Sequence, residues 1–309
     1  MRALPLFALF VSGCLVLPVQ AAEPRVWLER LAQADKQSFQ GTFIYERNGS
    51  FSTHAIWHQG GEGAVNERLL QLDGASQEVL RVDGRPQCVS GALADQVVDV
   101  QWPARHLDAT QLEQRYEMRM LGRSRVAGRS AVVLALIPRD QYRYAFELHL
   151  DEETAVPLKS LLISEKGQLL ERFQFVTLEP SEHLDASALK PGSACQPVTY
   201  NKVEELAQAW QAGWVPPGFE LSRALQRTTP ESSQPVASLL YGDGLARFTI
   251  FLEPLNGVGA EDARSQLGPT AVVSRRISTS GGDMMVTVVG EIPMGTAERV
   301  ALSMQEPAQ

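Results

Sequence analysis

The most constraining feature of this chain is a two-residue turn, Asn48-Gly49, between two segments rich in aromatic and β-branched residues. A turn of this kind joins adjacent antiparallel strands, because both of its positions need a positive φ. Residues 41–47 and 50–58 are therefore predicted to form a hairpin. Further turn signals follow at Asp73-Gly74, Asp83-Gly84, Ala127-Gly128, Asp151-Glu152 and Lys166-Gly167, with runs of seven to ten residues between most of them. This spacing predicts an antiparallel meander.

The hairpin is apolar on both faces. A two-residue turn fixes the strand register, and side chains alternate between the faces of a strand. One face then carries Phe43, Tyr45 and Ile56, and the other carries Ile44, Phe51 and Trp57. Residues 132–137 are also apolar throughout. We therefore expect part of the sheet to be covered on both sides, either by a filled two-layer core or by a bound ligand.

The chain length and composition fit a globular protein of about two domains. It has 309 residues, of which 44% are hydrophobic and 21% charged. Composition shifts to Pro, Ser, Ala and Gly over residues 179–213. We therefore expect a large mostly β domain over 22–200, a linker over 201–213 and a smaller α+β domain over 214–309.

The N-terminus resembles a secretory leader. Arg2 supplies a positive charge, residues 4–17 are almost entirely apolar, and Val19-Gln20-Ala21 forms a small-x-small cleavage site. We predict a signal peptide over 1–21 with cleavage after Ala21. Lipid attachment at Cys14 is the alternative, although the residues that follow it are apolar where lipoproteins are usually polar. The longest later apolar run, 131–137, is too short to span a bilayer.

Charge and cysteine content narrow the function further. The formal net charge of −8 makes the chain a poor nucleic-acid binder, because an acidic field repels phosphate backbones. Beyond the leader only Cys88 and Cys195 remain. In an oxidising compartment such a pair predicts a disulfide, and two buried free thiols are the alternative.

No catalytic, phosphate-binding or metal-binding motif is found in the sequence. His54 and His58 lie four residues apart, but no third ligand follows at zinc-site spacing, which favours two surface histidines. We therefore expect no enzyme activity, no cofactor and no metal.

One basic cluster stands out, formed by Arg115, Arg119, Arg123, Arg125 and Arg129. If residues 115–121 form a strand, Arg115 and Arg119 point to one side, and Tyr116, Met118 and Met120 to the other. Guanidinium groups beside flexible apolar side chains suit an anionic lipid. The alternative is a solvated face whose arginines pair with acids elsewhere in the fold.

Several segments, in their order and spacing, resemble the RseB/MucB family over essentially the whole mature chain. They are FQGTFIYER at 39–47, RLLQLDG at 68–74, PLKS at 157–160, LLERF at 169–173, WVPPGF at 214–219 and YGDGL at 241–245. The resemblance implies a LolA/LolB-like open half-barrel of antiparallel strands around helices, followed by a smaller α+β domain.

The resemblance also implies a function. Members of this family are periplasmic regulators that bind the periplasmic domain of a MucA/RseA-like membrane anti-sigma factor and shield it from proteolysis. Lipid or lipopolysaccharide is thought to release them. A periplasmic lipid carrier or lipoprotein chaperone stays open as the alternative, as does a homo-oligomer. Face counting alone nominates the lipid- or partner-binding residues Phe43, Ile44, Tyr45, Trp57, Arg115, Tyr116, Met118, Arg119 and Met120.

Overall fold

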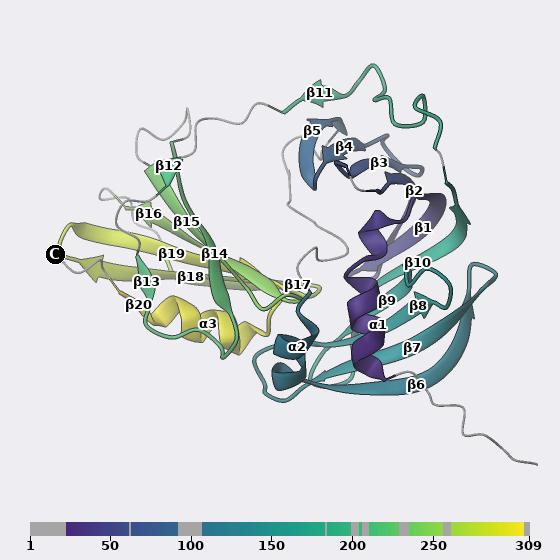
Figure 1. Ribbon diagram of the computed structural model, residues 1–309. Coiled ribbons are helices and arrows are strands. Elements are labelled where there is room, and N and C mark those ends of the chain that lie inside the picture. The colour runs from purple at the N-terminus through teal and green to yellow at the C-terminus, as the bar shows by residue number, and fades with distance from the viewer. Residues whose placement is uncertain are drawn as a thin grey trace, which may run out of the picture.

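The computed structural model describes residues 23–305 apart from 62, 92–106, 183, 199–203, 206–209, 229–234 and 256–260. The predicted leader and its cleavage site lie outside the described residues. Two sheets of different size dominate the architecture (Figure 1). None of the described helices is long and apolar enough to cross a membrane.

The large domain is one open antiparallel sheet of eleven strands, in the order β11-β5-β4-β3-β2-β1-β10-β9-β8-β7-β6. Its edges, β11 and β6, do not pair with each other, so the sheet curves without closing (Figure 1). The strands are β1 (Phe39–Arg47), β2 (Ser50–Gln59), β3 (Asn66–Gln71), β4 (Glu78–Val82), β5 (Arg85–Val89), β6 (Tyr116–Val126), β7 (Arg129–Pro138), β8 (Ala145–Asp151), β9 (Pro157–Ile163), β10 (Leu169–Pro180) and β11 (Gln196–Pro197).

The turns follow the predicted chemistry. Asn48 and Gly49 have φ angles of 53° and 73°, and this turn joins β1 to β2 in a continuous register from Arg47↔Ser50 to Phe39↔His58. Both Asp83-Gly84 and Ala127-Gly128 also have positive φ at each position. The predicted meander is confirmed, with one addition: β1 also pairs with β10, from the far end of the domain.

Helices cover the concave face of the sheet. They are α1 (Pro24–Leu31), the 3-10 turn η1 (Ala34–Lys36) and α2 (Ala109–Arg115). Leu28 and Leu31 of α1 and Leu112 of α2 are buried against inward-facing residues such as Leu134 and Leu148. Pro24 occupies the N1 position of α1. Its missing backbone N–H costs nothing there, because an amide at N1 has no hydrogen-bond acceptor within the helix.

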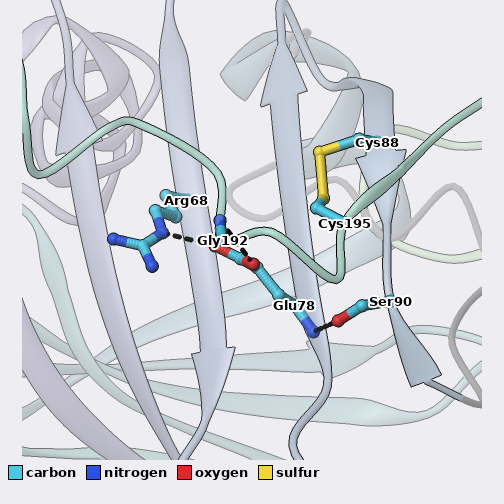
Figure 2. The surroundings of a disulfide bond; sticks show 6 residues. All are labelled: Arg68, Glu78, Cys88, Ser90, Gly192 and Cys195. Carbon is cyan, nitrogen blue, oxygen red and sulfur yellow. Dashed lines mark hydrogen bonds and ion pairs between the residues drawn. A yellow bond between two sulfur atoms is a disulfide. The ribbon is translucent and has the colours of Figure 1, made fainter.

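The convex face of β3–β5 is covered by chain that returns from β10. We call residues 181–198 the return strap. The side chain of Arg68 donates to the carbonyl of Ala188 (3.0 Å), and the amide of Gly192 donates to the Glu78 carboxylate (3.0 Å). A disulfide joins Cys88 of β5 to Cys195 of the strap (Figure 2). The predicted disulfide is thus present, and the strap covers part of the convex face of β3–β5.

The C-terminal domain is a seven-stranded antiparallel sheet in the order β12-β14-β15-β16-β19-β18-β17, with α3 (Met294–Leu302) against one face (Figure 1). The buried face packs Ile250 and Val288 against Val300 of α3. Its strands are β12 (Glu204–Glu205), β14 (Glu220–Thr228), β15 (Pro235–Gly242), β16 (Arg247–Pro254), β17 (Ala263–Leu267), β18 (Thr270–Thr279) and β19 (Gly282–Gly290), and β13 (Gln211–Ala212) pairs separately with β20 (Met304–Gln305). Both β12 and β13 lie within the predicted linker range. The predicted α+β class is confirmed.

The two domains contact each other through the loop between β7 and β8. Arg143 forms an ion pair with Asp243, and it also donates to the carbonyl of Pro217 (2.6 Å). On either side, Tyr144 donates to the carbonyl of Ile292 (3.1 Å) and Thr296 donates to the carbonyl of Tyr142 (3.3 Å). These hydrogen bonds define a docked arrangement of the two domains.

Candidate binding face of the large domain

An aromatic cluster lies where the centre of the sheet meets its concave face. The ring of Phe43 is 4.7 Å from that of Phe173 and 5.9 Å from that of Phe175, and the latter two rings meet edge to face at 5.1 Å. Phe39 contacts Phe175 in the same way. We call Phe39, Phe43, Phe173 and Phe175 the aromatic cluster. Edge-to-face rings at these distances stabilise one another beyond their burial.

The cluster is only partly covered. Phe43 and Phe175 are buried, whereas Phe173 and the neighbouring Tyr45 are half-buried and pack against the core from its margin. Half-buried aromatic side chains on a concave surface are typical of an apolar ligand site. The cluster therefore provides a surface on which an acyl chain or an apolar peptide side chain could lie.

A polar rim borders this surface. The Tyr45 hydroxyl donates to the Glu171 carboxylate (2.6 Å), and Glu291 of the C-terminal domain lies within range of Arg47, at 3.9 Å. Burial, with the nearby negative charge of Glu291, raises the pKa of Glu171 to about 7. Burial also raises the pKa of Tyr45. Glu171 therefore titrates close to neutral pH at a point where the two domains meet.

A cavity of about 300 Å³ adjoins this rim. It lies between the β1–β2 turn, the start of β10 and the β17–β18 turn, and its lining residues are Glu46, Asn48, Gly49, Leu169, Leu170, Glu171, Gln266 and Gly268. Both domains contribute to its walls, so any change in their docking changes its shape.

The structure places the nominated hairpin residues on the two predicted faces. Phe43 and Tyr45 face the concave core, whereas Ile44 and Trp57 point to the convex side. There the guanidinium of Arg68 lies 4.9 Å over the Trp57 ring. These four residues therefore do not form one site, and only Phe43 and Tyr45 belong to the aromatic surface.

The residues nominated on and before β6 separate in a similar way. Arg115 is the last residue of α2 and not part of a strand, because β6 begins at Tyr116. Tyr116 is fully buried and donates to Asp243 (3.2 Å), so it belongs to the domain interface. Met118 and Met120 pack against the core, on the face opposite to Arg119, as predicted.

The arginine cluster is largely paired. Arg119, which is 56% exposed, binds Glu117 at 2.7 Å. Arg123 binds Glu152 at 2.9 Å, and Arg129 binds both Asp151 and Glu153. This geometry matches the solvated, acid-paired face that we kept as the alternative to a lipid headgroup site.

The prediction of two surface histidines is wrong for His58. Its ring is buried, lies 3.1 Å from Glu67 and 2.8 Å from the carbonyl of Asp35, and stacks on Phe39 at 4.7 Å. His54 is half-buried, and burial lowers its pKa. Both rings point inward because period-two alternation places them on the face of Ile56. No group of three potential metal ligands occurs among the described residues.

Sequence reasoning did not nominate Phe173, Phe175 or Glu171. Their alternation along β10 was a usable signal, but the pairing that brings them beside β1 joins residues about 130 positions apart. Nothing in the sequence indicated that Arg143 and Asp243 pair, because an ion pair between two domains leaves no local pattern.

The fold and the partly open aromatic surface define a two-domain binding protein. The chain belongs to the MucB/RseB family: the MucB/RseB N-terminal domain matches residues 23–193, and the MucB/RseB C-terminal domain matches residues 204–305. It is 59% identical to the sigma factor AlgU regulatory protein MucB of Pseudomonas aeruginosa, over 100% of this chain and 99% of that protein. It is 26% identical to the sigma-E factor regulatory protein RseB of Haemophilus influenzae, over 97% of this chain and 98% of that protein.

Solved structures agree with this assignment. The complex of P. aeruginosa MucA and MucB contains a chain that superposes with a TM-score of 0.82 at 60% identity, covering 93% of this chain and all of that one. A crystal structure of MucB superposes with a TM-score of 0.73 at 58% identity, covering 94% of this chain and 99% of that one.

Proposed function

We propose that this protein is a periplasmic regulator that binds the periplasmic domain of a MucA-like membrane anti-sigma factor. Bound there, it shields the anti-sigma factor from regulated proteolysis and so keeps an envelope-stress sigma factor inactive. The observation that carries this proposal is the 59% identity, over the full length, to a named regulator of the sigma factor AlgU. The likeness to a MucB chain solved in complex with MucA supports the choice of partner.

Export to the periplasm rests on the predicted leader over residues 1–21 and on the family. The Cys88–Cys195 disulfide supports the same location, because such bonds persist in oxidising compartments. A binding function, rather than an enzymatic one, is in keeping with the regulatory names of the relatives.

A lipid or lipopolysaccharide ligand would use the aromatic surface. Phe173 and Tyr45 are half-buried there and can contact an acyl chain without displacing the helices that fill the rest of the concave face. Arg119 and Arg115 are the nominated headgroup contacts, although Arg119 would first have to leave Glu117. Of the convex-side candidates, Ile44 and Trp57 would serve the partner rather than the lipid.

Lipid then weakens partner binding by favouring a different arrangement of the two domains. Linkage makes this effect reciprocal: the factor by which lipid lowers partner affinity equals the factor by which partner lowers lipid affinity. The Tyr45–Glu171 rim beside the domain interface offers a physical route for this coupling, because it touches both the aromatic surface and Arg47.

Calorimetry of the mature protein against the periplasmic segment of the co-encoded anti-sigma factor tests the proposal. We expect micromolar or tighter binding that weakens when lipopolysaccharide is added. Phe173→Ala should abolish the lipid effect and leave partner binding intact, and Phe51→Ala on the convex face is the matched control. If no heat is observed with the partner, but the protein transfers labelled lipid between vesicles, the protein is a lipid carrier and the regulator proposal is wrong.

A further inference from the structure

The return strap is held to the large domain with little apolar contact. No residue that the structure describes between 181 and 198 is buried. Its contacts include the Ala188 and Gly192 hydrogen bonds and that of the Val198 amide to the carbonyl of Gln87 (2.9 Å), besides the two-residue strand β11. Without apolar burial, hydrogen bonds worth about 1 kcal/mol each do not by themselves recover the entropy lost on ordering such a segment. The disulfide is therefore the contact that keeps the strap in place.

The disulfide also sets how much chain connects the two domains. With the bond intact, the large domain ends at Pro197–Val198, and the C-terminal sheet begins at Glu204. Without it, the last firm attachment is the end of β10 at Pro180. A longer tether lowers the effective concentration of one docking surface at the other, roughly as the −3/2 power of tether length.

We propose that the Cys88–Cys195 disulfide is a redox-controlled clamp: a dithiol reductant releases the return strap, lengthens the interdomain tether and weakens the docking centred on Arg143 and Asp243. This inference concerns the protein alone and does not depend on the proposed partner.

The two sulfur atoms differ in access. Cys88 is buried in β5, whereas Cys195 is half-buried on the strap (Figure 2). A thiolate of the reductant attacks Sγ of Cys195 and displaces Cys88 as a thiolate. The second thiolate of the reductant then attacks the reductant's first sulfur, which is bonded to Cys195, and Cys195 leaves as a thiolate. Two electrons pass from the dithiol to the protein, both cysteines end as thiols, and the reductant becomes a disulfide.

Glu78 makes the strap position specific. Its carboxylate accepts from Arg68 at 2.6 Å and from Gly192, and its amide donates to the Ser90 hydroxyl at 2.9 Å (Figure 2). A Cβ at position 192 would lie 2.9 Å from a Glu78 carboxylate oxygen. Gly192→Ala thus weakens strap seating without touching either cysteine.

Two measurements on the full chain test the clamp, each with and without dithiothreitol. Hydrogen exchange at the Gly192 and Val198 amides reports strap release, and protection should fall at least tenfold on reduction. Single-molecule energy transfer between labels on non-natural residues at the exposed positions 125 and 302 reports domain docking. The undocked fraction should rise roughly fivefold on reduction.

Controls separate the clamp from general destabilisation. Cys88→Ser with Cys195→Ser should behave like the reduced protein and not respond to dithiothreitol, and reoxidation of the wild type should restore both signals. Gly192→Ala should leave docking unchanged while oxidised and increase strap exchange further once reduced. If reduction leaves strap protection intact, or frees the strap while the undocked fraction changes less than twofold, the clamp is ruled out.

Discussion

Arg143 and Asp243 come from different domains, and neither side chain of their ion pair has any exposed area. Burying two charges is costly unless further hydrogen bonds satisfy them. Here Arg143 also donates to Asp140 and to the carbonyl of Pro217, and Asp243 accepts from Tyr116. The Phe219 ring lies 5.0 Å below the guanidinium. This network fixes one relative orientation of the domains.

Breaking the buried pair should undock the domains. Arg143→Met leaves Asp243 buried without its cation, and removing one partner of such a pair costs about 3–5 kcal/mol. We expect a loss of that size in the free energy of unfolding, together with a larger radius of gyration by small-angle X-ray scattering.

The matched control is Arg119→Ala, which removes an exposed pair of arginine and carboxylate and should leave the free energy of unfolding nearly unchanged. Equal effects of the two substitutions would show that the interface does not depend on Arg143.

Stability should depend on the pH through Glu171. Its pKa is raised from the ordinary 4.5 to about 7, chiefly by burial, so between these values the folded state holds a proton that the unfolded state has released. The contribution of Glu171 to the free energy of unfolding is therefore fully present below pH 4.5 and is lost as the pH rises through 7. Glu171→Gln should remove this pH dependence, so that its free energy of unfolding relative to the wild type is about 3 kcal/mol higher at pH 8 than at pH 4.

Urea unfolding of both proteins at several pH values measures the difference. Tyr45→Phe removes a donor that favours the ionised carboxylate, so it should shift the same transition to higher pH. Parallel pH profiles for wild type and Glu171→Gln would contradict this assignment.

Substitutions in the aromatic cluster should distinguish residues needed for packing from residues needed for lipid binding. Phe43 is buried at its centre, so Phe43→Ala should destabilise the large domain by about 3–5 kcal/mol. Phe173 lies at the half-buried margin, so Phe173→Ala should destabilise the domain less than Phe43→Ala does. It should nevertheless remove most of the lipid binding. Thermal unfolding and vesicle co-sedimentation measure the two effects, and Phe51→Ala, whose side chain is 63% exposed, should change neither.

The close approach of β1 to β10 should require Gly41. A Cβ at this position would lie 2.3 Å from the carbonyl oxygen of Thr177, beside the register shift in this strand pair. Gly41→Ala should therefore destabilise the protein by about 1–3 kcal/mol, measured by chemical denaturation. Gly63→Ala is the control, because nothing lies within 4 Å of a Cβ there. Equal denaturation midpoints for the two variants would show that β1 and β10 can move apart to admit a side chain at position 41 without a loss of stability.

Local chemistry explains what could be predicted from the sequence. The Asn48-Gly49 turn has one compatible geometry, so the faces of Phe43 and Ile44 followed from counting. Cys88 and Cys195 had no other partners beyond the leader. By contrast, His58 was misjudged because its burial depends on Asp35 and Phe39 together, and Asp35 lies on η1, 23 residues away in the sequence.

Features that depend on distant pairing could not be predicted. Tyr116 was expected to face a ligand, yet it meets Asp243, 127 residues away, inside the domain interface. The strap was equally hidden, since nothing in residues 181–198 but Cys195 marks where this segment returns. Such contacts are set by the global fold, and a single sequence carries no record of them.

The position of β1 between β2 and β10 has a consequence for how the chain is assembled. As the chain emerges from its N-terminus, β1–β5 and β6–β9 can each form from neighbouring strands. β1 nevertheless keeps one edge unpaired until β10 is made, more than 120 residues later. The two halves of the large domain are thus joined last, by contacts of high sequence separation, which are the slowest to form. Any factor that delays β10 leaves an open, aromatic strand edge exposed to other chains.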